Sequence, residues 1–134
     1  MKGTIEGKMV ECVLEALPLE ITILDRDDRI IAWNEREPRL FSRGGEIMGR
    51  DVRTCHSKES NGMIDRMLSE MKAGSRDVFR FWYDHAIAGE ERTEKILIEY
   101  IALRDSGGGY TGCMETVQRI GGIQGLKGER REPV

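Results

Sequence analysis

The segment from Glu94 to Leu103 is the feature that most restricts how this chain can fold. Its side chains alternate with the period of a β-strand, and both faces of that strand are apolar. One face carries Ile96, Ile98, Tyr100 and Ala102, and the other carries Leu97, Ile101 and Leu103. A strand that is apolar on both faces is usually covered on both. The sequence therefore predicts a sheet with small helices against one face. The other face would be covered by the first helix or by a second copy of the chain.

The rest of the pattern predicts the elements around this strand. A helix over 5–17 ends before Pro18, and a strand–turn–strand hairpin follows at 21–33. Residues 34–48 suit short helices and turns, and a longer helix over about 59–72 is capped by Ser57 and ended by Gly74. Further strands are expected at 77–85, 94–103 and 110–120. We expect one α+β domain with a flanking N-terminal helix (1–17), a core (18–120) and an exit linker or frayed tail (121–134).

Composition excludes several classes of function. The 134 residues carry a net charge of −3, which provides no positive field for nucleic acid. No apolar run approaches the roughly 20 residues of a membrane span. Three cysteines form no zinc-ligand spacing, so reduced thiols in a cytoplasmic protein are the simplest interpretation.

The order of these elements, with three short motifs, resembles a PAS domain. Leu24 to Asn34 is similar to the PAS opening hairpin, including the asparagine that starts the first small helix. Ile47 to Val52 resembles the segment before the long helix, and 110–120 resembles the last strand and its exit. The resemblance implies a five-stranded antiparallel sheet with small helices on one face.

A narrower resemblance surrounds His56. Gly49 to His56 and the later Phe81-Trp82 pair are similar to a signalling PAS subfamily with "GRxVxxCHPPxS" and "FW", although Ser57 replaces the first proline. The stretch also resembles the heme-binding PAS domain of bacterial CO-responsive regulators, in which the corresponding histidine ligates iron. That likeness implies heme b as cofactor and His56 as the axial metal ligand.

A heme pocket also needs an apolar cavity and a cation for the propionates. The residues expected to line such a pocket are His56, Met63, Ile64, Met67, Trp82, Ile98 and Met114, with Arg53 as a propionate partner. A structural histidine that only caps the helix is the alternative, because most lone histidines bind no metal.

The leading hypothesis is a sensory PAS domain that binds a small ligand, with heme b for diatomic gas sensing as the named candidate. It would act as a homodimer and pass its signal to a partner protein or output domain. The alternative is a ligand-free dimerisation or protein-interaction module. A flavin–cysteine adduct is disfavoured by the position of Cys55, and an enzyme using Cys55 and His56 ranks last because no orienting third group is evident.

Overall fold

All five predicted strands belong to one antiparallel sheet in the computed structural model, which describes residues 1–133. The strands are β1 (Glu20–Asp25), β2 (Ile30–Trp33), β3 (Val78–Ala86), β4 (Thr93–Arg104) and β5 (Tyr110–Arg119). Their order in the sheet is β2-β1-β5-β4-β3, so the doubly apolar strand β4 lies inside the sheet and β2 and β3 form its edges. The predicted five-stranded antiparallel α+β fold is confirmed.

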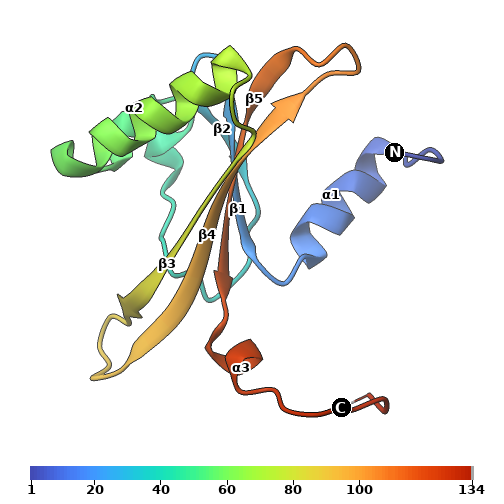
Figure 1. The fold of residues 1–134 in the computed structure, drawn as a ribbon, viewed down its shortest axis with the longest axis vertical. Helices are drawn as coiled ribbons and strands as arrows, with labels where there is room; N and C mark the ends of the chain where they lie inside the picture. The colour runs from blue at the N-terminus through green and yellow to red at the C-terminus, as the bar shows by residue number, and fades with distance from the viewer. Residues whose placement is uncertain (134) are drawn as a thin grey trace.

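Helix α2 (Lys58–Ala73) covers one face of the sheet (Figure 1). The Ser57 hydroxyl accepts a hydrogen bond from the Ser60 amide, and Gly74 ends the helix with a positive φ of 73°, as the sequence predicts. Four α2 side chains are buried against the sheet: Ile64, Met67, Leu68 and Met71. Burying an aliphatic side chain of this size contributes roughly 2 kcal/mol. This stripe therefore anchors α2 to the helix-covered face.

Helix α1 (Gly7–Ala16) lies on the other side of the sheet from α2 (Figure 1). None of its residues is buried, and its apolar side chains Met9 and Val13 are 55% and 45% exposed. The outer face of the sheet carries a cross-strand apolar row in which Met114 is paired with both Ile23 and Ile101. Helix α1 therefore leaves part of this second apolar face without cover.

The segment after β2 differs in one respect from what the resemblance to PAS domains implies. No helix begins at Asn34. Its buried side chain instead accepts from the Ile21 amide and donates to the Leu19 carbonyl, which joins β1 to the end of β2. The short helices begin later, at η1 (Gly45–Ile47) and η2 (Val52–Cys55).

A final turn, α3 (Gly121–Gln124), follows β5. Within residues 1–133, no helix is long and apolar enough to cross a membrane.

Candidate functional site

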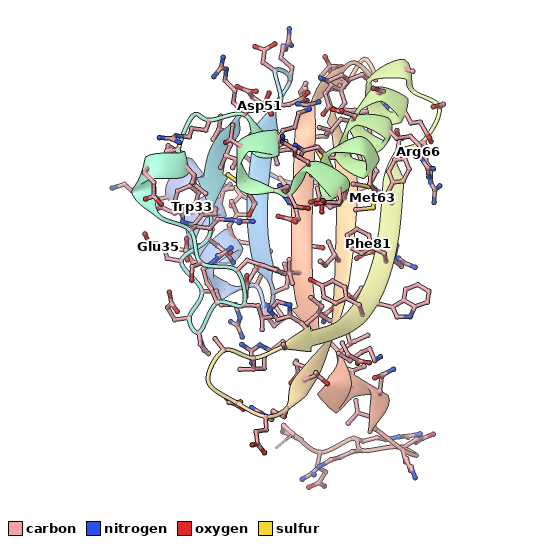
Figure 2. All side chains as sticks on the ribbon, turned by 90° about the vertical axis from the view of Figure 1, so that its left-hand side faces the viewer. Trp33, Glu35, Asp51, Met63, Arg66 and Phe81 are labelled. Carbon is pink, nitrogen blue, oxygen red and sulfur yellow. The ribbon has the colours of Figure 1, made fainter. Side chains whose placement is uncertain are left out.

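A cavity of about 440 Å³ lies between α2 and the sheet. Its size falls within the range of small-molecule sites, roughly 300–1,000 Å³. Figure 2 looks onto this face and shows Phe81 of β3 beneath Met63 of α2. The apolar wall consists of Phe41, Met63, Ile64, Phe81 and Ile98, and the polar lining consists of Arg43, Cys55, His56, Ser57, Ser60, Tyr83, Tyr100 and Glu115. An apolar wall combined with convergent polar groups is the usual form of a ligand site.

His56 is held at the end of η2 by a hydrogen bond of its own ring. Its Nδ1 lies 2.9 Å from the Val52 carbonyl oxygen. A carbonyl oxygen only accepts, so in the neutral ring Nδ1 carries the proton and Nε2 keeps its lone pair. This is the arrangement that orients a ligating histidine. His56 therefore presents one available nitrogen at a cavity wall.

The floor of the cavity carries a buried ion pair. Arg43, from the segment before η1, places Nη2 3.0 Å from Glu115 Oε2 on β5, and the two side chains are only 12% and 10% exposed. The Tyr100 hydroxyl donates to Glu115 Oε1 at 2.8 Å. Burial, reinforced by the Glu115 carboxylate, raises the pKa of Tyr100 well above its ordinary value. Tyr100 therefore remains a neutral hydrogen-bond donor at any physiological pH.

The register of the sheet explains why these groups meet. Thr22 of β1 is paired with Glu115 of β5, and Glu115 is paired with Tyr100 of β4. All three side chains thus occupy one cross-strand row on the helix-covered face. Arg43 reaches over this row, with Nη2 3.3 Å from the Thr22 hydroxyl and 3.0 Å from Glu115.

Four of the predicted site residues meet at the cavity: His56, Met63, Ile64 and Ile98. Met67 is 2% exposed and packs in the core, where it does not line the cavity.

Three other predictions are wrong for geometric reasons. Trp82 is 63% exposed and, like Met114, lies on the sheet face opposite the cavity, because neighbouring strand residues alternate in direction. Arg53 does not line the cavity. Its guanidinium pairs with Asp65 at 2.5 Å, Asp51 at 3.1 Å and Asp28 at 3.1 Å. These carboxylates, Asp65 foremost, raise the pKa of Arg53.

Sequence reasoning missed the polar floor. Glu115 stands between Cys113 and Val117 on the inward face of β5, and a carboxylate at an inward strand position is a signal that strand periodicity could have shown. Arg43 carried no such signal, because it lies outside any regular element and reaches Glu115 across 72 residues of sequence.

The comparisons with known proteins agree with this architecture. Residues 10–121 match the model of the PAS domain family, and the chain belongs to that family. PAS domains are sensory and signal-transduction modules, and this chain falls in that class. No curated protein matched the chain.

Solved structures extend the likeness over nearly the whole chain. The C-terminal domain of a protein from Streptococcus mutans is 27% identical with a TM-score of 0.84, covering 95% of this chain and 94% of that one. The PAS domain of BvgS from Bordetella pertussis is 18% identical with a TM-score of 0.64, covering 84% and 85%. A sensory box sensor histidine kinase from Vibrio cholerae is 16% identical with a TM-score of 0.55, covering 83% and 88%. At these identities the last two structures support the fold alone.

Proposed function

We propose that this PAS domain senses a small ligand held in the cavity between α2 and the sheet, with His56 as its anchoring group. The observation that carries the proposal is the His56 ring, whose Nδ1 is bound to Val52 while the ring lines the cavity. Occupation of the cavity would change the packing of α2 on the sheet. A partner protein or an output domain would respond to that change.

Heme b is the first ligand to test, because His56 Nε2 is the donor that an axial position requires. Arg43 replaces Arg53 as the propionate partner in this proposal, since it is the arginine that lines the cavity. Bound heme would supply an iron that takes up a diatomic gas. The protein would supply the oriented imidazole, the apolar walls and the guanidinium.

The test is the absorption spectrum of protein produced with added heme precursor. We expect a Soret band that His56→Ala abolishes while the circular dichroism spectrum is unchanged. His85→Ala is the matched control, because His85 is the other histidine and does not line this cavity. A colourless protein that ignores added hemin, or a band that survives His56→Ala, would refute the heme assignment.

A second candidate function is a dimerisation module that needs no ligand. The exposed apolar side chains of α1 and the half-buried outer row of the sheet favour it, because an apolar surface of this kind commonly marks an interface. The two functions are compatible, since the interface and the cavity lie on opposite faces of the sheet. Ligand-induced changes in the sheet would then reach the second subunit directly.

Sedimentation equilibrium tests this second candidate by measuring the oligomeric state of the chain. Leu97→Glu, on the outer face of β4, is expected to shift a homodimer towards monomer, and Leu14→Glu in α1 should act the same way. Lys58→Glu, at the start of α2 on the other face, is the control and should leave the dimer intact. A wild-type chain that is monomeric at every concentration would exclude this function.

The cellular setting belongs to the same proposal. The three cysteines are free, and Cys12 is exposed. Unpaired thiols suit a reducing compartment. We therefore propose a cytoplasmic location.

A further inference from the structure

The ion pair on the cavity floor has more hydrogen-bonding capacity than the protein uses. Glu115 accepts one hydrogen bond at each carboxylate oxygen, whereas an ionised carboxylate has about four acceptor positions. Arg43 uses Nη2 and Nε, and its Nη1 has no hydrogen-bond partner among residues 1–133. Both charges thus retain free positions in a cavity that they line.

A contribution to the stability of the fold does not explain the Arg43–Glu115 pair well. Removing two charges from water costs several kcal/mol per ion, and a buried pair often contributes no more than apolar residues of the same volume. The pair nevertheless lies on the floor of a cavity that apolar side chains, among them Phe41, Phe81 and Ile98, also line. Charged groups that line a cavity and have unused hydrogen-bonding positions are suited to recognising a ligand.

The signs of the charges restrict which ligand fits. A purely anionic ligand would satisfy Arg43 but leave Glu115 facing a like charge, and a purely cationic ligand would do the reverse. A ligand carrying both an ammonium and a carboxylate adds no net charge to the cavity. It also gives each buried group an opposite partner.

We infer that the cavity recognises an α-amino acid or a similar zwitterion, with its ammonium on Glu115, its carboxylate on Arg43 and an apolar side chain against Phe41, Phe81 and Ile98. The inference rests on the proposed function, because it requires that this cavity binds a ligand. It deepens that function by naming the ligand class. An amino acid would occupy the cavity in place of heme b, whose anionic propionates have no counterpart for Glu115.

The experiment is calorimetric titration of the purified chain with the standard L-amino acids. We expect saturable binding that is strongest for an apolar or aromatic side chain. For the best binder, the matched amine without the carboxylate and the matched acid without the ammonium should each bind at least roughly tenfold more weakly.

Two pairs of variants locate the site. Arg43→Met and Glu115→Gln should each weaken binding by a factor of roughly ten or more. If Arg43→Met folds poorly, Glu115→Gln still tests the site, because glutamine keeps the shape of the glutamate side chain. Arg80→Met and Glu99→Gln are the controls, because Arg80 and Glu99 form a similar pair, 2.6 Å apart, on the outer face of the sheet. These controls should bind as the wild type does.

The outcomes separate this inference from the function beneath it. Binding of no amino acid, or equal binding of the matched amine or acid, overturns the zwitterion inference. If hemin then still gives a Soret band that depends on His56, the proposed sensory cavity stands. If neither amino acids nor hemin bind, both proposals fail.

Discussion

Replacing Asn34 is the most direct test of how the sheet is joined to the segment between α1 and β1. Its side chain is buried, with Oδ1 2.8 Å from the Ile21 amide and Nδ2 2.9 Å from the Leu19 carbonyl. A third, longer contact of 3.3 Å reaches the Leu14 carbonyl in α1. Oδ1 also accepts from Arg39 Nη1 at 3.2 Å. Replacing Asn34 by alanine removes all four contacts and leaves the backbone groups in place.

The expected cost follows from the groups that lose their partners. The Ile21 amide and the Leu19 carbonyl would each remain unsatisfied, at about 1–3 kcal/mol for a buried group. The longer contact to Leu14 adds little, so Asn34→Ala should lower the free energy of unfolding by about 2–6 kcal/mol. With a urea dependence of about 2 kcal/mol per molar, the unfolding midpoint should fall by about 1–3 M.

Asn61→Ala is the matched control for this measurement. Asn61 lies in α2, and its Oδ1 has no hydrogen-bond partner among residues 1–133. Alanine is the better helix former, so this change should be neutral within about 0.5 kcal/mol or slightly stabilising. If Asn34→Ala costs no more than Asn61→Ala, the account of the Asn34 contacts is wrong.

The remaining predictions concern the cap, the core and the buried thiol. Ser57→Ala should lower the free energy of unfolding by about 1 kcal/mol in urea titrations, because the hydroxyl accepts from the Ser60 amide at 3.3 Å. Met71→Ala should cost roughly 2–5 kcal/mol in the same assay, because Met71 is fully buried. Burial raises the pKa of Cys113 to about 12. The unfolded chain ionises at lower pH, so the unfolding free energy should fall as pH rises from about 9 towards 12, with a flatter decline in Cys113→Ala. With a thiol reagent at neutral pH, the exposed Cys12 should react at once and Cys113 only after unfolding; equal rates would contradict the burial of Cys113.

Local signals in the sequence were enough to predict the elements. The Ser57 cap, the Gly74 stop and the apolar stripe of α2 each depend on neighbours within a few residues, and the structure confirms all three. Strand periodicity likewise placed Ile98 on the cavity face of β4.

The same periodicity failed on β3 for a physical reason. Phe81 and Trp82 are adjacent aromatic residues, and one of them must point away from the other. Nothing local says which one faces α2. The pairing of β3 with β4 decides it, by setting Phe81 opposite Ile98 and Trp82 opposite Leu97.

The segment Glu94–Leu103 by itself determined that this chain forms a sheet with two apolar faces, because alternation along a strand is a property of the covalent chain. The tertiary structure alone decided what meets on each face. Arg43 and Glu115 come together because strand register and the path of the segment before η1 place them 3.0 Å apart. Such a contact depends on the packing of elements distant in sequence, and no local pattern encodes it.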